Sequence, residues 1–441
     1  MKRVTEPFSA DAPGLADGEA QRQPGALTGS VGDFHGRDGR HLLDRWLPHE
    51  QWWRARLDEG VDPYCKGLLG PPGPVARGAY RDGTPFEGVN FASQDYLSLS
   101  MHPAVLAAAT EAAATYGVHS AGSASLMGNT ALSWRLEQAL AAFLGVADCT
   151  LFSTGWGAGY GLIRTLVSPA DHVVLDILAH ACLYEGAHAA TAKVHRVLHL
   201  SKDALERRLK RIRAAEPDAG ILVVTEALFS MDSDMPDIGG IQALCDAYGA
   251  TLMLDVAHDF GALGPTGRGV LELQQVLGKV DLVMGSFSKC FATNGGFVAT
   301  NHPALKLALR SSGPTQTFTN AIGPVGAAIA QTCLDIVQGA EGAARRARLA
   351  TNVDYLRARL TEAGFELLGR PSAIVPVVLG EVATARRMTA HAIANGALVN
   401  LVEYPAVSRN SSRWRLQVMA DHEPWQIDRL VETAIAARRR A

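Results

Sequence analysis

The residues with the clearest chemical potential lie in two stretches, 251–269 and 281–297, which both begin apolar and continue into polar, glycine-rich chain. The apolar runs at 251–254 and 282–284 are too short for buried helices, and we interpret them as buried parallel strands. In open α/β sheets, ligands bind beyond the carboxyl ends of such strands. One edge of the sheet should therefore carry an acid, an imidazole, two hydroxyls and a lysine: Asp255, His258, Ser286, Ser288 and Lys289.

This set of residue types matches the needs of pyridoxal phosphate (PLP). The cofactor requires a lysine for a Schiff base, a carboxylate that keeps its ring nitrogen protonated, and donors for its phenolate and phosphate. Short motifs of this kind also arise without such a function. A lysine after a strand is often a solvated loop residue, and Asp255 with His258 also fits a metal pair or a helix cap. The residues alone leave these alternatives open.

Two motifs resemble those of a known enzyme family. Residues 255–269, DVAHDFGALGPTGRG, resemble the D-E-A-H-S-x-G-x-x-G-x-x-G-R-G signature of the α-oxoamine synthases, and GSFSK at 285–289 resembles their lysine motif. The similarity extends from about Leu57 to the C-terminus. It implies an α/β protein of PLP-dependent fold type I, with a large domain on a mostly parallel seven-stranded sheet and a small C-terminal α+β domain. It also implies condensation of an amino acid with an acyl thioester, with loss of CO₂.

The resemblance assigns roles to individual residues. Lys289 would bind the cofactor and act as base, and Asp255 would pair with the ring nitrogen. His180, in LAHACLYEG, would stack on the ring, and His258 would hydrogen-bond the phenolate. These four residues are the expected catalytic set. A glycine turn at the start of a helix favours phosphate binding. The expected cofactor-binding residues are Gly155, Trp156, His180, Glu226, Ser230, Asp255, His258, Ser286, Ser288, Lys289, Thr319 and Asn320.

Two C-terminal motifs extend the expected site. SRWRLQVMADH at 412–422 resembles the family pattern x-R-x-R-[LI]-x-x-S-A-x-H, which implies that Arg413 grips the substrate carboxylate through a bidentate fork. Arg415 would then be structural. TQTFTNAIGP at 315–324 resembles a segment that reaches the neighbouring subunit's phosphate, which implies a homodimer with shared active sites. Thr319 and Asn320 are the candidates there, although an ordinary helix N-cap explains them equally well.

Several positions depart from the family pattern and leave the substrates open. Ala124 stands where the family has Arg, Ser133 where it has His, and Trp156 where it has Tyr or Phe. Ser98 replaces a Gly, and Cys182 replaces a common Ser. The acyl group could be carried by coenzyme A or by a carrier protein, and the amino acid could be Gly, Ala, Ser or another. The layout before residue 91 resembles bacterial serine palmitoyltransferases, which favours serine and a long acyl chain.

The alternation of strand and helix patterns predicts right-handed parallel crossovers. We expect strands at 149–153, 172–177, 221–226, 294–300, 373–379, 398–402 and 414–419, and helices at 103–116, 238–248 and 322–364. Polar, Pro- and Gly-rich composition predicts a disordered tail over 1–40. The remaining expected divisions are an N-terminal helix and docking segment at 41–88, a large PLP-binding domain at 89–325 and a small domain at 326–441.

Composition excludes some classes of protein. A formal charge of −3 in 441 residues provides no field for nucleic acid. No apolar run reaches the ~18 residues that would span a bilayer. The six cysteines have no metal-like spacing and suggest reduced thiols in a cytoplasm. Three competing functions remain: an aminotransferase or lyase of the same fold without acyl donor, a silent partner subunit, and a metal hydrolase using Asp255, His258 and His180, for which no metal motif is present.

Overall fold

The computed structural model describes residues 25–34 and 39–441, in two compact units that divide between Asp62 and Pro63. The first unit holds three short helices: η1 (Val31–Phe34), η2 (Asp44–Trp46) and α1 (Leu47–Asp58). The tail predicted at 1–40 falls largely outside the described residues. Within residues 25–34, Phe34 is buried, and the Trp52 indole donates to the Gly25 carbonyl at 3.1 Å.

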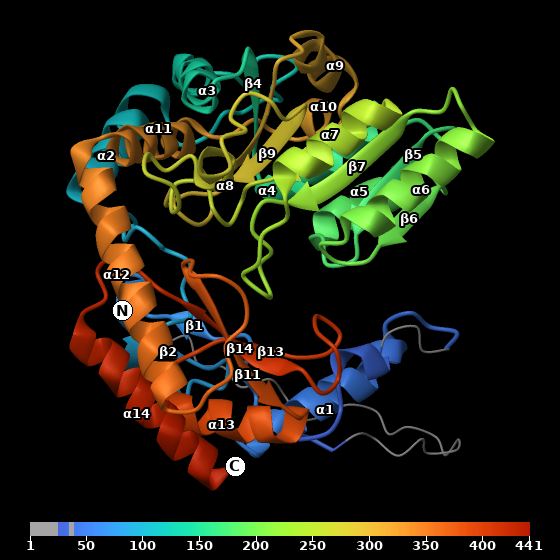
Figure 1. Ribbon diagram of the computed structural model, residues 1–441. Helices are drawn as coiled ribbons and strands as arrows, with labels where there is room; N and C mark the ends of the chain where they lie inside the picture. Colours follow the sequence, from blue (N-terminus) through green and yellow to red (C-terminus); the bar gives the residue numbers. More distant parts are fainter. Residues whose placement is uncertain (1–24, 35–38) are drawn as a thin grey trace. The chain divides into compact units, whose positions relative to one another are not determined.

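A seven-stranded sheet with the order β4-β10-β9-β8-β7-β5-β6 is the centre of the second unit (Figure 1). Its strands are β4 (Asp148–Phe152), β5 (His172–Asp176), β6 (Val194–Val197), β7 (Ile221–Glu226), β8 (Thr251–Asp255), β9 (Leu282–Ser286) and β10 (Gly296–Thr300). Only β10 runs opposite to the other six strands of this sheet. The predicted mostly parallel seven-stranded sheet is therefore confirmed, although the sequence analysis did not identify β6.

Both faces of this sheet are buried, because alternate side chains along each strand enter different cores. Leu222 and Val224 of β7 belong to one core and Val223 to the other. The helices of the first core are α4 (Gly155–Leu166), α5 (Ala181–Ala190) and α9 (Ala304–Ser312), followed by the short α10 (Pro314–Thr317). The second core includes α3 (Ala131–Leu144), α6 (Lys202–Ala215), α7 (Ile238–Tyr248), α8 (Gly269–Leu273) and α11 (Pro324–Gln338), which packs against α2 (Pro103–Tyr116).

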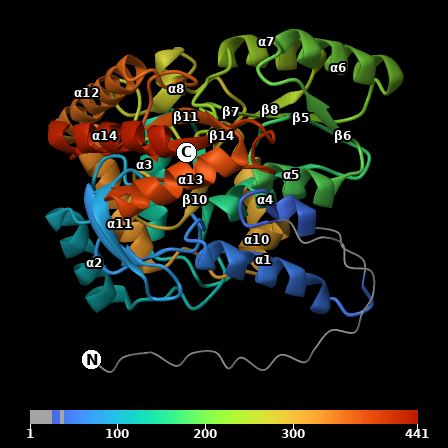
Figure 2. The ribbon, with the colours of Figure 1, turned by 90° about the horizontal axis from the view of Figure 1, so that it is seen from below.

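The C-terminal part is an α+β arrangement, as expected (Figure 2). Its antiparallel sheet has the order β11-β14-β13, and α12 packs against α14. The elements are α12 (Ala340–Glu362), β11 (Ile374–Gly380), α13 (Val382–Ala394), β12 (Ala397–Leu398), β13 (Leu401–Val402), β14 (Ser412–Gln417) and α14 (Pro424–Arg440). The helical stretch predicted at 322–364 is two helices, because the chain becomes extended at Gly339.

A second small sheet joins distant parts of the chain. Strands β1 (Gly67–Leu68), β2 (Val75–Ala79) and β3 (Pro85–Asn90) form an antiparallel meander, and β3 pairs in parallel with β12. Gly88 makes this close approach feasible, since a Cβ there would lie 2.2 Å from the Gly396 carbonyl oxygen. Residues 67–90 are thus bound to the C-terminal part by main-chain hydrogen bonds. Within the described ranges, no helix combines the length and apolarity that a bilayer crossing needs.

Candidate active site

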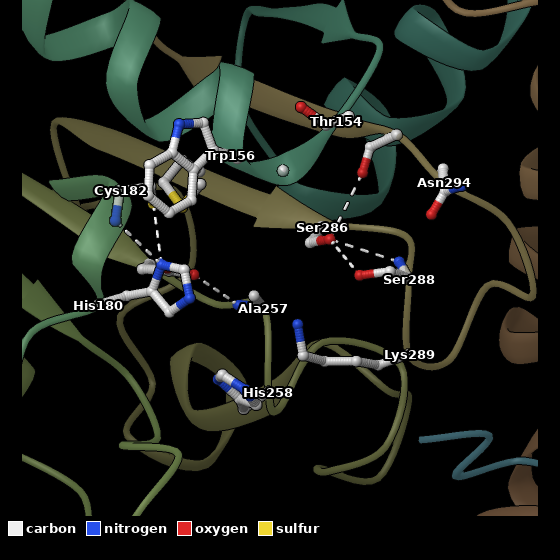
Figure 3. Close-up of a pocket in the computed structure, with 14 residues that line it drawn as sticks. Thr154, Trp156, His180, Cys182, Ala257, His258, Ser286, Ser288, Lys289 and Asn294 are labelled. Carbon is white, nitrogen blue, oxygen red and sulfur yellow. Dashed lines mark hydrogen bonds between the residues drawn. The ribbon is translucent and has the colours of Figure 1, made fainter. Parts of the chain in front are cut away.

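A cavity of about 200 Å³ lies at the carboxyl edge of the large sheet (Figure 3). Because β8 and β9 are parallel neighbours, the polar residues at their ends meet at this edge. The cavity is lined by Thr154, Gly155, Trp156, His180, Cys182, Asp255, Ala257, His258, Met284, Ser286, Ser288, Lys289, Asn294 and Gly295. It therefore brings together the expected lysine, carboxylate, histidines and hydroxyls.

The lysine and the carboxylate affect each other's ionisation. Asp255 is the last residue of β8, and Lys289 follows the end of β9. Burial lowers the pKa of Lys289, and the charge of Arg415 lowers it further, while Asp255 opposes both. Burial raises the pKa of Asp255, against the Ala257 N–H that donates to its Oδ1 at 2.8 Å. A cation close to this buried carboxylate would keep it ionised.

Two histidines line the cavity. His180 is the N-cap of α5, and its ring lies edge-on to Trp156 with centroids 6.0 Å apart. Burial lowers the pKa of His180, as do Lys289 and Arg415, although Asp255 raises it. Burial also places the pKa of His258 well below its ordinary range. Both rings are therefore neutral near pH 7.

The end of the cavity opposite Asp255 suits an anion. Helix α4 begins there, and Thr154 caps it by accepting the Gly157 N–H at 2.9 Å. The first N–H groups of a helix have no partner within the helix, and its dipole favours negative charge. Ser286 and Ser288 present hydroxyls 2.7 Å apart beside this helix start. Gly155 is required for the close packing, since a Cβ there would lie 2.5 Å from Ser286 Cβ.

These features fit PLP. Asp255 offers a buried carboxylate for the cationic ring nitrogen, Lys289 an amine for the aldehyde, and the α4 terminus with two hydroxyls a phosphate site. Beneath the cavity residues, Glu226 Oε2 and His258 Nδ1 are buried without a hydrogen-bond partner in the described part of the chain. These two atoms lie 3.8 Å apart, and burial raises the pKa of Glu226 well above its ordinary range. These two polar atoms are therefore available to hydrogen-bond a ligand.

The remaining predicted residues lie outside the lining of this cavity. Glu226 and Ser230 are buried. Thr319 donates its hydroxyl to the Thr315 carbonyl oxygen at 2.7 Å, and the Asn320 amide contacts His119 at 3.0 Å. Both are exposed in the single chain. The sequence analysis overlooked Thr154 and Asn294, which line the cavity; a Thr before a glycine turn was an N-cap signal available in the sequence.

Two arginines of β14 lie in different surroundings. Arg413 is buried in β14, forms an ion pair with Asp232, and donates to the Ser411 carbonyl at 3.0 Å. The arginine whose charge acts on the cavity is Arg415, since it lowers the pKa of Lys289, His180 and His258. Arg415 Nε is buried and has no hydrogen-bond partner among the described residues. Arg413 thus already has a protein carboxylate as its partner.

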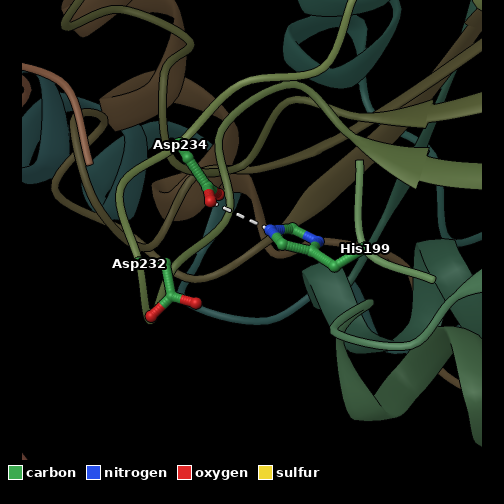
Figure 4. A group of neighbouring side chains, drawn as sticks. All are labelled: His199, Asp232 and Asp234. Carbon is green, nitrogen blue, oxygen red and sulfur yellow. Dashed lines mark hydrogen bonds and ion pairs between the residues drawn. The ribbon is translucent and has the colours of Figure 1, made fainter. Parts of the chain in front are cut away.

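Asp232 also belongs to a cluster of titratable side chains (Figure 4). His199, Asp232 and Asp234 have ligand atoms within 4.8 Å of one another. Both His199 nitrogens are engaged, Nδ1 with Asp176 Oδ1 at 2.8 Å and Nε2 with Asp234 Oδ2 at 2.9 Å. The ring must carry two protons to donate to both carboxylates, and Arg413 neutralises Asp232. The cluster is thus an ion-pair network and presents no vacant imidazole lone pair to a metal.

Comparisons with known proteins agree with this geometry. Residues 87–433 match the family model for aminotransferase class I and II. The chain is 35% identical to an 8-amino-7-oxononanoate synthase of Geobacter sulfurreducens, over 78% of this chain and 87% of that protein. It is 34% identical to a 2-amino-3-ketobutyrate coenzyme A ligase of Escherichia coli, over 78% and 86%.

Solved structures match a larger share of the chain. A serine palmitoyltransferase of Sphingomonas wittichii superposes with a TM-score of 0.83 at 31% identity, covering 91% of this chain and 98% of that one. A variant serine palmitoyltransferase from S. paucimobilis with a bound PLP–myriocin aldimine gives a TM-score of 0.84 at 32% identity, covering 91% of this chain and 99% of that one.

Fold and cavity together define a PLP-dependent transferase of fold type I. The chain belongs to the α-oxoamine synthase family, within the class I and II aminotransferases. It is accordingly an acyltransferase that uses PLP to condense an amino acid with an acyl thioester.

Proposed function

We propose the following roles for the cavity residues in this condensation. Lys289 Nζ holds the cofactor through its aldehyde, and Asp255 pairs with its ring nitrogen. His180 lies against the ring, and His258, with the buried Glu226 behind it, faces the phenolate side. Gly155, Trp156, Ser286 and Ser288 hold the phosphate. What carries this proposal is the meeting of Lys289 and Asp255, from adjacent strands, on one cavity.

When bound, PLP withdraws electrons from the α-carbon of the amino acid. Once displaced from the aldehyde by the amino acid, Lys289 Nζ would take the α-proton, and burial lowers its pKa, which favours the neutral amine. A carbon–carbon bond forms between the α-carbon and the acyl carbonyl carbon as the carbon–sulfur bond breaks and free thiol leaves. The carboxylate departs as CO₂, and a proton returns to the α-carbon.

Arg415 is our candidate for the substrate carboxylate, in place of Arg413. Its charge acts on the three cavity groups that surround the reacting carbon, and its Nε is buried without a protein partner in the described chain. A guanidinium binds a carboxylate through two parallel hydrogen bonds. Arg413, already paired with Asp232, has a structural role in this proposal.

A second cavity of about 300 Å³ shares Ser288, Lys289 and Asn294 with the first. Its other lining residues are mostly polar: Pro72, Ser93, Gln94, Asp95, Ser100, Ala292 and Thr293. Lys289 thus stands between a cavity suited to the cofactor and one open to solvent. We assign the second cavity to the entering acyl thioester, which must meet the α-carbon beside this lysine.

We propose serine and a long-chain acyl thioester as the substrates. The support is the wider coverage of this chain by the serine palmitoyltransferase structures, 91% against 78% for the synthase and ligase sequences. The layout of the segment before residue 91 also resembles that of bacterial serine palmitoyltransferases. The acyl carrier, coenzyme A or a carrier protein, is decided by comparing the two forms of one acyl group as substrates.

The active form is proposed to be a homodimer with shared sites, in a cytoplasm. Segments 118–127 and 318–321 adjoin, since Asn320 bridges Ser123. Together they expose four large apolar side chains at 77–92%: Val118, Leu126, Met127 and Phe318. An exposed apolar group of this kind marks an interface. Thr319 and Asn320 lie within it, which suits a contribution to the partner's phosphate site.

The test uses purified protein with PLP. The wild type should show a visible absorption band that Lys289→Ala abolishes and that the exposed-lysine control Lys279→Ala retains. Serine with a long-chain acyl-CoA should release free thiol and CO₂ in equal amounts. An aminotransferase or lyase would instead turn over the amino acid without acyl donor. Turnover that is independent of thioester, or an identical band in Lys289→Ala, contradicts the proposal.

A further inference from the structure

The Cys182 side chain contacts His180 at the rim of the cavity. Cys182 Sγ lies 3.1 Å from His180 Nδ1, within the range of a sulfur hydrogen bond. The backbone N–H of Cys182 also donates to the same nitrogen, at 3.3 Å. Both contacts come from the first turn of α5, which His180 caps (Figure 3). One ring nitrogen of His180 therefore faces two groups of a single residue.

These contacts determine which ring nitrogen carries the proton. A backbone N–H can only donate, so His180 Nδ1 must be an acceptor and is unprotonated. The thiol must then be the second donor, through its S–H. Burial raises the pKa of Cys182 well above physiological pH, so that proton is always present. In the neutral ring the remaining proton lies on Nε2, the nitrogen directed away from Cys182.

We propose that Cys182 is a positioning residue, whose thiol holds His180 as the neutral Nε2–H tautomer with its ring face toward the cofactor. This rests on the proposed place of His180 against PLP. A hydrogen bond donated to the neutral form disfavours protonation of the ring. A ring held neutral can lie against a cationic cofactor without charge repulsion. The Cys182 thiol also packs closely against Gly159 of α4. A Cβ added to Gly159 would lie 2.9 Å from Sγ, so the glycine leaves just enough room for the thiol.

The other charged groups around His180 come from different elements. Asp255 at the end of β8 raises the pKa of His180, whereas Lys289 after β9 and Arg415 on β14 lower it. Trp156 on α4 presents an uncharged ring. None of these groups is altered by a substitution at position 182, so a change in His180 titration reports the loss of the thiol donor.

The experiment compares Cys182→Ala, Cys182→Ser and a control, Cys245→Ala, which removes another buried thiol, in α7 away from the cavity. Each PLP-loaded protein is labelled at its histidine rings, and the His180 resonance, assigned by its loss in His180→Gln, is followed against pH by NMR. Loss of a hydrogen bond of ordinary strength predicts a rise of about half a pKa unit in Cys182→Ala. Cys182→Ser keeps a donor and should stay near the wild type.

The acid limb of kcat/KM should move to higher pH with the His180 pKa in Cys182→Ala alone. Thermal unfolding of the two alanine variants separates this effect from a loss of packing, which both share. Equal His180 pKa values in wild type and Cys182→Ala overturn the proposal. So does a Cys182→Ser protein that behaves like Cys182→Ala, because a hydroxyl also donates. The NMR titration is independent of which amino acid and thioester react, so it can fail while the proposed function holds.

Discussion

His199 should make the stability of this protein decline at alkaline pH. Burial alone lowers the pKa of His199, but hydrogen bonds to Asp176 and Asp234, and their charges, outweigh burial and raise it to about 9. The ordinary value is 6.5. Because the folded-state pKa is raised, the stabilisation is fully present below pH 6.5 and is lost as pH rises through 9. The window is therefore the interval between these two values.

The size of the effect follows from the shift. A difference of about 2.5 units corresponds to about 3 kcal/mol, since one unit is 1.36 kcal/mol. The side chain is only 18% exposed, so solvent screening removes a minor part of this. For a chain of 441 residues the unfolding entropy is about 0.9 kcal/mol per kelvin, which converts the stabilisation into about 3 °C of Tm.

The assay is thermal unfolding of wild type and His199→Gln in buffers from pH 6 to 10. Gln keeps polar contacts but cannot be charged, so the Tm difference isolates the imidazolium. It should be about 3 °C at pH 6.5 and shrink toward zero near pH 10. His188→Gln, on an exposed histidine, should show no such trend. A Tm difference for His199→Gln that stays constant across this range refutes the reasoning.

Three further predictions concern the site and its supports. Gly155→Ala should weaken PLP affinity at least about tenfold, measured by titration of the apoprotein, because the added methyl would displace the start of α4 from Ser286; unchanged affinity contradicts the phosphate site. Arg415→Ala should raise KM for the amino acid much more than Arg413→Ala does, and the reverse ranking would restore the original assignment. Ser98 has φ +55°, and Ser98→Val should lower the unfolding free energy by more than about 1 kcal/mol in urea titrations, whereas Ser98→Gly should change it by less.

The sequence analysis identified strands whose apolar pattern is complete within a short segment of chain. Strands β7, β8 and β9 are short apolar runs that end in a polar residue, and such runs are visible without any tertiary information. Strand β6 was overlooked because VHRV alternates in polarity at the edge of the sheet and is only partly buried. The break at Gly339 was overlooked because apolar periodicity continues on both sides of a single glycine.

The roles of the two arginines of β14 cannot be read from the local sequence pattern. Arg413 and Arg415 are alternate residues of β14 and point to the same side of the strand. Charge and spacing are alike for both, so the sequence could not say which one acts by its charge on the cavity residues. The distinction comes from Asp232, which lies on a loop far away in the sequence and engages Arg413. Only the folded chain brings that carboxylate to β14.

The buried charges explain why this cavity suits a ligand with separated charges. At one end, Asp255 is buried, and burial raises its pKa and so disfavours its ionised form. At the other end, the N-terminus of α4 and two hydroxyls favour an anion. A neutral ligand would satisfy neither end, and a simple anion would satisfy only one. A molecule with a cationic ring nitrogen and a phosphate satisfies both ends, and burial lowers the pKa of Lys289, which favours the neutral amine that can bind an aldehyde.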